Sequence, residues 1–183
     1  MKFVFFFFYT FLTSLAAAQT YYSAESGQVK FFSKAPLEDI EAKNNKVKAV
    51  INDSTGEVAV LIPIKSFTFK KSLMQEHFNE NYLESDKFKD ASFKGKLSDK
   101  IVLKPSEQKT INVWGQLLIH GVTQQRMITA LLTKSADGSL NATGKFYVKI
   151  ADHHIKVPTL LFENIAEVVE VTFNFTLKPQ THL

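Results

Sequence analysis

Residues 168–177 read Val-Val-Glu-Val-Thr-Phe-Asn-Phe-Thr-Leu, and this stretch decides the fold class. From Val169 to Leu177 every second residue is apolar, and the residues between them are Glu, Thr or Asn. Successive side chains of a β-strand point to opposite faces, so this alternation predicts a strand with one buried and one exposed face. The same alternation recurs in further segments, at 29–31, 47–51, 93–97, 111–119 and 146–150.

Turn-forming residues separate these segments and leave mostly hairpin-length connections. They lie at 53–56 (DSTG), 104–106 (KPS), 121 (G) and 137–138 (DG). Short connections of this kind favour antiparallel neighbours over strand-helix-strand units. About eight strands with one apolar face each can hide those faces in a closed barrel, which also leaves no unpaired edge. We therefore predict an all-β protein, built as an antiparallel barrel of about eight strands.

Residues 70–85 break the alternation. Met74, Phe78 and Tyr82 recur every four residues, which is the spacing of one face of an α-helix. Ser72 can cap the first turn, and Gln75 stands at the capping-box position. The sequence thus predicts one amphipathic helix of about three to four turns, inserted near mid-chain.

Some of the predicted barrel residues would be apolar on the outside as well. The segments 58–64 (VAVLIPI) and 127–132 (MITALL) are apolar on both faces, so we expect another element to cover them. Trp114 is out of phase with Val113 and Gly115, which places it on the outer face or at a rim. There we expect the helix to cover it.

The first 18 residues have the order of a secretory signal peptide. Lys2 precedes an apolar run over residues 3–15, and the small residues Ala16, Ala17 and Ala18 follow. We expect cleavage between Ala18 and Gln19, export to the periplasm, and a single barrel domain over residues 19–183. The apolar run is shorter than the roughly 20 residues of a spanning helix, so we expect no transmembrane anchor.

The composition excludes several kinds of chemistry. The chain contains no Cys, which excludes thiol catalysis and cysteine-based zinc sites. The formal net charge of +4 comes almost wholly from scattered Lys residues, with Arg126 the only Arg, so we expect no nucleic-acid partner. No G-x-S-x-G elbow or phosphate-binding Gly-rich loop occurs. We therefore assign no catalytic residue, no cofactor and no metal.

The histidines leave one alternative open. None forms an H-E-x-x-H or H-x-H pair, but His77, His120 and Glu76 could assemble a zinc site in three dimensions. A metal-dependent enzyme is thus one alternative hypothesis for the chain. Capping or surface positions are the usual alternative for such residues.

Several motifs resemble the YceI-like family. The segment 115–123 (GQLLIHGVT) is similar to that family's G-x-L-T-I-H-G-x-T signature, and 87–93 (KFKDASF) is similar to its K-Y-P-x-A-x-F motif. Residues 27–33 (GQVKFFS) and the closing strand at 168–177 also resemble segments of that family, and all these segments occur in the family's order. Two positions depart from these family motifs: Lys89 stands where Pro is common, and Leu118 stands where Thr is common. Neither departure affects the alternation that predicts the barrel. The helix motif E-H-F-N-E-N-Y resembles the sub-branch common in Bacteroidetes-like bacteria.

The resemblance implies an exported, lipocalin-like barrel whose cavity binds a polyisoprenoid or a similar long apolar chain, such as an isoprenoid quinone, without catalysis. Periodicity alone does not distinguish a cavity from a solid core, and the resemblance favours the cavity. The expected lining is Phe31, Phe67, Phe69, Met74, Phe78, Tyr82, Phe93, Val113, Leu117, Phe146, Val148, Phe173 and Phe175. A non-catalytic envelope or stress protein with a filled core is the second hypothesis. The oligomeric state stays open between a monomer and a homodimer.

Overall fold

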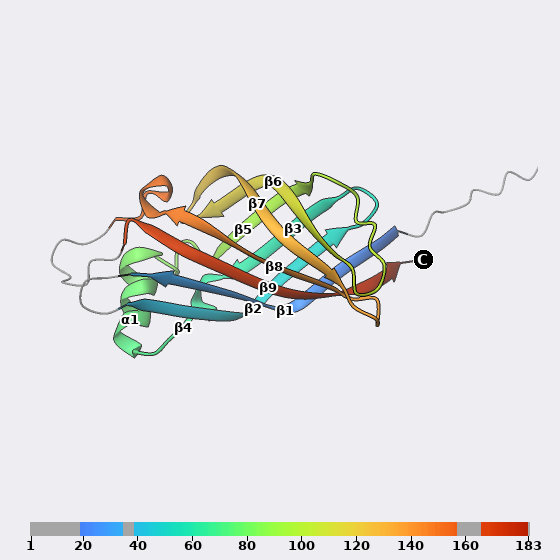
Figure 1. Ribbon diagram of the computed structural model, residues 1–183. Helices are drawn as coiled ribbons and strands as arrows, with labels where there is room; N and C mark the ends of the chain where they lie inside the picture. Colours follow the sequence, from blue (N-terminus) through green and yellow to red (C-terminus); the bar gives the residue numbers. More distant parts are fainter. Residues whose placement is uncertain (1–18, 35–38, 157–165, 183) are drawn as a thin grey trace, which may run out of the picture.

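A computed structural model describes residues 19–34, 39–156 and 166–182 of the chain (Figure 1). The expected signal peptide at 1–18, and a short turn that the sequence allows around 160–164, lie outside the described residues. None of the described helices is long or apolar enough to cross a membrane.

The described chain folds into one antiparallel sheet that closes on itself. The strands run in the order β1-β9-β8-β7-β6-β5-β3-β2, and pairing of β1 with β2 closes the barrel. The two-residue strand β4 adds to the edge of β2. This confirms the predicted eight-stranded antiparallel barrel. The strands are β1 (Gln19–Ser33), β2 (Ile40–Asn52), β3 (Glu57–Pro63), β4 (Thr68–Phe69), β5 (Asp90–Leu97), β6 (Gln108–Ile119), β7 (Val122–Lys134), β8 (Leu140–Lys149) and β9 (Val168–His182).

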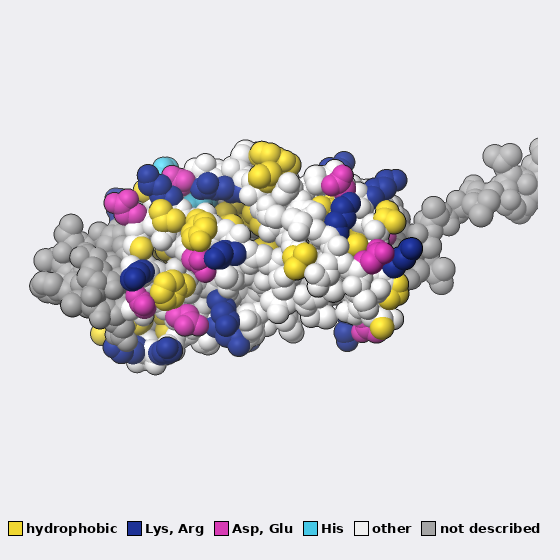
Figure 2. All heavy atoms as spheres, viewed as in Figure 1, with side chains coloured by type: hydrophobic (Ala, Val, Ile, Leu, Met, Phe, Trp, Pro, Cys, Tyr) yellow, Lys and Arg dark blue, Asp and Glu magenta, His cyan; other side chains and the backbone are white. Residues whose placement is uncertain are grey.

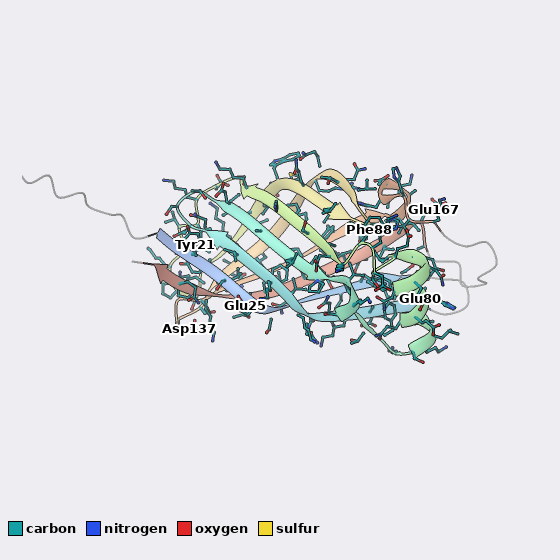
Figure 3. All side chains as sticks on the ribbon, turned by 180° about the vertical axis from the view of Figure 1, so that it is seen from behind. Tyr21, Glu25, Glu80, Phe88, Asp137 and Glu167 are labelled. Atoms are coloured by element: carbon teal, nitrogen blue, oxygen red, sulfur yellow. The ribbon has the colours of Figure 1, made fainter. Side chains whose placement is uncertain are left out.

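The barrel is elongated, and its two ends differ. Figure 1 shows the helix at one end and the described chain termini at the other. Seen from behind, Glu80, Phe88 and Glu167 lie at the helix end, whereas Tyr21 and Asp137 lie at the far end (Figure 3). Towards the far end, Leu132, Leu140 and Leu177 are almost completely buried. The alternating apolar residues thus supply the core of the barrel.

The predicted helix is present, with different bounds and a different start. α1 (Ser72–His77) continues directly into the π-helical turn η2 (Phe78–Tyr82), and the 3-10 turn η1 (Ile64–Ser66) precedes both. The expected cap at Ser72 was wrong, because Lys71 is the N-cap residue and no side chain caps the helix. The Oε1 atom of Gln75 instead accepts a hydrogen bond from the backbone N–H of Phe69, at 3.4 Å, which ties the helix start to β4.

Within the described residues, no element covers the outer face of the barrel as expected. Trp114 is 59% exposed and its cross-strand neighbour Met127 is 48% exposed; Leu61 on β3 is also exposed. Figure 2 shows apolar side chains gathered over β6 and β7. The expectation was wrong because the helix lies at the end of the barrel, with its apolar residues turned inward, and so does not reach the outer wall.

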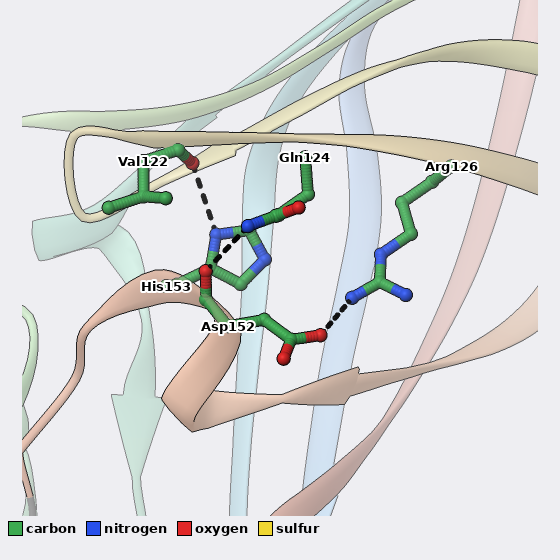
Figure 4. Close-up of polar contacts among 5 residues, drawn as sticks. All are labelled: Val122, Gln124, Arg126, Asp152 and His153. Carbon is green, nitrogen blue, oxygen red and sulfur yellow. Dashed lines mark hydrogen bonds and ion pairs between the residues drawn. The ribbon is translucent and has the colours of Figure 1, made fainter.

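The wall between β7 and β8 is only partly hydrogen-bonded. These strands pair from Ala130 to Lys134 of β7, whereas β6 and β7 pair along their whole lengths. In the N-terminal part of β7, before Ala130, the short turn η3 (Ile150–His153) contacts β7 in place of β8. The guanidinium of Arg126 donates to the Asp152 carboxylate at 2.8 Å, and the amide of Gln124 donates to the Asp152 carbonyl at 2.8 Å (Figure 4). Polar side-chain contacts thus complete the wall near the helix end.

Candidate functional site: an apolar cavity inside the barrel

The larger of two internal cavities, of about 150 Å³, lies at the helix end. Side chains of β1, β8 and β9 form much of its wall, single residues of β2, β3, β5 and β6 complete it, and the apolar face of the helix covers it. Its lining residues are Val29, Phe31, Ser33, Ile40, Ile62, Ile64, Phe67, Phe69, Met74, His77, Phe78, Tyr82, Leu83, Ala91, Ile119, Phe146, Val148, Ile150, Ile155, Val169 and Val171. None of these residues is a Lys, Arg, Asp or Glu.

A smaller cavity of about 80 Å³ continues towards the far end of the barrel. Val29, Ile62, Phe146 and Val171 line both cavities, so the two adjoin one another. The smaller cavity has an entirely apolar lining, which includes Phe93, Val113, Phe173 and Phe175. The two cavities thus follow one another along the barrel, with shared side chains such as Phe146 between them.

Four phenylalanine rings pack together beneath the helix. The centroid of the Phe78 ring lies 5.4 Å from that of Phe31, 5.5 Å from that of Phe67 and 5.0 Å from that of Phe69. These are ordinary distances for offset or edge-to-face aromatic pairs. Because Phe31 comes from β1 and Phe78 from η2, the rings join the helix to the barrel wall. The same four rings line the larger cavity.

Glycine makes room for the rings in the smaller cavity. A Cβ atom at Gly144 would lie 2.4 Å from the Phe173 ring, and one at Gly27 would lie 2.4 Å from the Phe175 ring. Both glycines occupy positions on the inner face of their strands, where any larger residue would displace a ring. The interior at this level is therefore shaped by large rings set against glycines of the neighbouring strands.

The structure brings most of the expected lining residues together. Phe31, Phe67, Phe69, Met74, Phe78, Tyr82, Phe146 and Val148 line the larger cavity, and Phe93, Val113, Phe146, Phe173 and Phe175 line the smaller one. Leu117 is completely buried but lines neither of these cavities. The sequence analysis missed aliphatic wall residues such as Val29, Ile62 and Val171, although the period-two pattern places the first and last of them on inner faces.

The histidines proposed for a zinc site have separate surroundings. His77 lines the larger cavity. The Nε2 atom of His120 lies 2.7 Å from a carboxylate oxygen of Glu84, and its Nδ1 atom lies 3.2 Å from the His153 carbonyl. No group of three or more His, Asp or Glu residues that could hold a metal occurs in the part of the chain that the structure describes. His120 instead connects the segment after the helix to the β6–β7 hairpin and η3.

His153 is a buried titratable group beside the cavity wall. Its side chain is fully buried, and its Nδ1 atom donates to the Val122 carbonyl at 3.1 Å (Figure 4). Burial lowers the pKa of His153, and the hydrogen bond to Val122 opposes the shift only in part. The neutral imidazole is thus the form that fits between η3 and β7.

The fold and the cavities define a lipocalin-like class of protein, a closed antiparallel barrel with an apolar interior. Residues 20–177 match the YceI-like domain family, and the chain belongs to that family. Its placement in a Bacteroidetes-like sub-branch stays a prediction. No curated protein sequence matches the chain.

Solved structures with the same fold are distant in sequence. A polyisoprenoid binding domain from Saccharophagus degradans, implicated in plant cell wall breakdown, superimposes with a TM-score of 0.76 at 14% identity, covering 90% of this chain and 100% of that one. BcnA of Burkholderia cenocepacia gives a TM-score of 0.67 at 14% identity, covering 83% and 96%. A YceI protein of Campylobacter jejuni gives 0.55 at 17% identity, covering 80% and 87%. At these identities the likeness establishes the shared barrel.

Proposed function

We propose that the chain is an exported, non-catalytic carrier that holds the hydrocarbon chain of a lipid, of the polyisoprenoid class, inside the barrel. The observation that carries the proposal is the pair of adjoining apolar cavities, which no Lys, Arg, Asp or Glu of the described residues lines. A wall of this kind suits a long apolar chain and offers little to a polar substrate. The likeness to a polyisoprenoid binding domain supports the same class of ligand.

Hydrophobic transfer supplies the binding free energy in this proposal. Each buried CH₂ group contributes about 0.8 kcal/mol, so a chain of a few isoprene units binds without specific polar contacts. A cavity of about 150 Å³ accepts a molecule the size of benzene, and the larger cavity has about this volume. Longer chains therefore extend into the smaller cavity and require the rings around Phe146 to rotate.

Export rests on the first 18 residues, which we propose to be removed before the protein acts in the periplasm. Edman sequencing of protein recovered from the periplasm should begin at Gln19. An uncleaved chain that starts at Met1 would contradict this part of the proposal.

Organic extraction of the protein purified from its own periplasm tests the carrier function. We expect mass spectrometry of the extract to show one isoprenoid-chain lipid in near-stoichiometric amount. Recovery of no lipid, together with no uptake of added isoprenoids by the purified protein, would overturn the proposal. A protein that acts through its surface alone would give that result.

A further inference from the structure

Among the described residues, His77 is the one histidine that lines the cavity. It is the last residue of α1, it is half-buried, and its side chain lines the larger cavity beside Phe78. Because it follows Met74 by three residues, it lies at the edge of the apolar face of the helix. A polar ring at this position is exceptional in a lining that is otherwise almost entirely apolar.

Two other polar side chains among the described residues line the same cavity, and both have contacts of their own. The Oγ atom of Ser33 accepts a hydrogen bond from the Ala166 backbone N–H at 2.9 Å. Tyr82 is buried and also interacts with other parts of the protein. For His77 the structure gives no hydrogen bond or ion pair within residues 19–34, 39–156 and 166–182. Its ring nitrogens are therefore available to a ligand.

The charge of the lining restricts what the ligand can present to His77. An anionic group such as a phosphate is costly to bury unless a positive charge compensates it, and no Lys or Arg of the described residues lines either cavity. A neutral imidazole carries one donor and one acceptor nitrogen, which suits a hydroxyl or carbonyl oxygen. The surroundings thus favour an uncharged oxygen group.

We propose that His77 hydrogen-bonds the polar end of the bound lipid, and that this end is an uncharged alcohol, phenol or quinone and not a phosphate ester. The inference rests on the proposed function, because it places the head of the same ligand. The head lies at the helix end, and the isoprenoid chain runs inward past Phe146 towards Phe175.

Calorimetric titration of purified protein with four probes tests this proposal. The probes are geranylgeraniol, the hydrocarbon of the same chain without the hydroxyl, geranylgeranyl monophosphate, and a quinone with an isoprenoid tail of similar length. Each is titrated into the wild type, His77→Phe and His77→Gln. Phenylalanine keeps a ring on the wall but removes both nitrogens, whereas glutamine keeps a donor and an acceptor.

One neutral hydrogen bond contributes about 0.5–1.5 kcal/mol, or roughly 2- to 13-fold in affinity. We expect His77→Phe to lower the ratio of alcohol to hydrocarbon affinity by about 3- to 10-fold, and His77→Gln to preserve most of it. An equal fall for the quinone supports both the alcohol and the quinone as heads, and a fall for only one of the two identifies the head that the site prefers. Unchanged hydrocarbon binding by His77→Phe would show that the cavity is intact.

Two results would overturn the inference while leaving the carrier function standing. One is an alcohol-to-hydrocarbon ratio that is the same in the wild type and in His77→Phe. The other is a monophosphate that binds more tightly than the alcohol and loses that advantage in His77→Phe, which would indicate a charged head. Failure of the wild type to bind even the hydrocarbon would instead refute the proposed function itself.

Discussion

Ala91→Phe should fill the larger cavity and abolish ligand binding. Ala91 is a buried residue on the inner face of β5, paired with Ile62 across the sheet, and it lines the larger cavity. Phenylalanine adds one six-carbon ring at this position. A cavity of about 150 Å³ is the size that accepts benzene, and the larger cavity has about this volume. The new ring therefore takes the space that we assign to the ligand.

The size of the effect follows from the carbon atoms that the ring excludes. Six ligand carbons at about 0.8 kcal/mol each amount to about 5 kcal/mol, which corresponds to a loss of affinity of about three orders of magnitude. The free energy of unfolding should change by no more than about 3 kcal/mol, because the ring enters existing space and overpacking is limited.

Titration with geranylgeraniol measures the loss, with Ala59→Phe as the matched control. Ala59 lies on the neighbouring strand β3 and is exposed on the outer face, so the same substitution there should leave the affinity unchanged. Thermal unfolding checks that both variants fold. A folded Ala91→Phe protein that binds within about tenfold of the wild type would refute the placement of the ligand in this cavity.

Three further predictions concern the frame around the cavity. Burial lowers the pKa of His153 in the folded state, so the unfolded chain binds the proton first, and the free energy of unfolding should fall as the pH drops below about 6.5, by at most about 1.4 kcal/mol per pH unit. Thermal unfolding between pH 5 and 8 should show a shallower fall for His153→Gln than for the wild type. An equal fall in both proteins would exclude His153 as its source. Gly144→Ala should destabilise the fold by about 1–3 kcal/mol in urea unfolding, because the methyl group meets the Phe173 ring; unchanged stability would mean that the ring is free to move. Phe78→Ala should lower the free energy of unfolding by up to about 3 kcal/mol and speed amide hydrogen exchange across α1, because it removes the ring that joins the helix to the barrel. Unchanged exchange would contradict the anchoring role of the four rings.

The barrel could be predicted from sequence because its signal is local. Period-two alternation and hairpin-length turns fix which residues share a face, and β9 shows this most clearly: Phe175 and Leu177 are buried, and Asn174 and Thr176 between them are exposed. A side chain that alternates inward in a closed barrel has few places to go other than the interior. The phenylalanines of the expected lining accordingly meet inside it.

The features that the sequence did not reveal depend on how distant segments meet. Periodicity placed Leu117 on an inner face but could not say at which level of the barrel the space remains open. It placed Trp114 outside, but the position of the helix decides whether anything covers it. Arg126 pairs with Asp152 because β7 and β8 separate near the helix end. No local sequence pattern predicts where two strands separate. From the sequence, His77 was a candidate only for the alternative zinc site, because its place on the cavity wall depends on how the helix packs on the barrel.

A crystal structure of the protein with geranylgeraniol tests the central claim most directly. We predict continuous electron density for one chain inside the barrel, with the hydroxyl near His77 and the tail running past Phe146 towards Phe175. The rings around Phe146 should be turned relative to their positions in the ligand-free protein. Density for the lipid on the outer surface alone, with the interior cavity unchanged, would contradict the account.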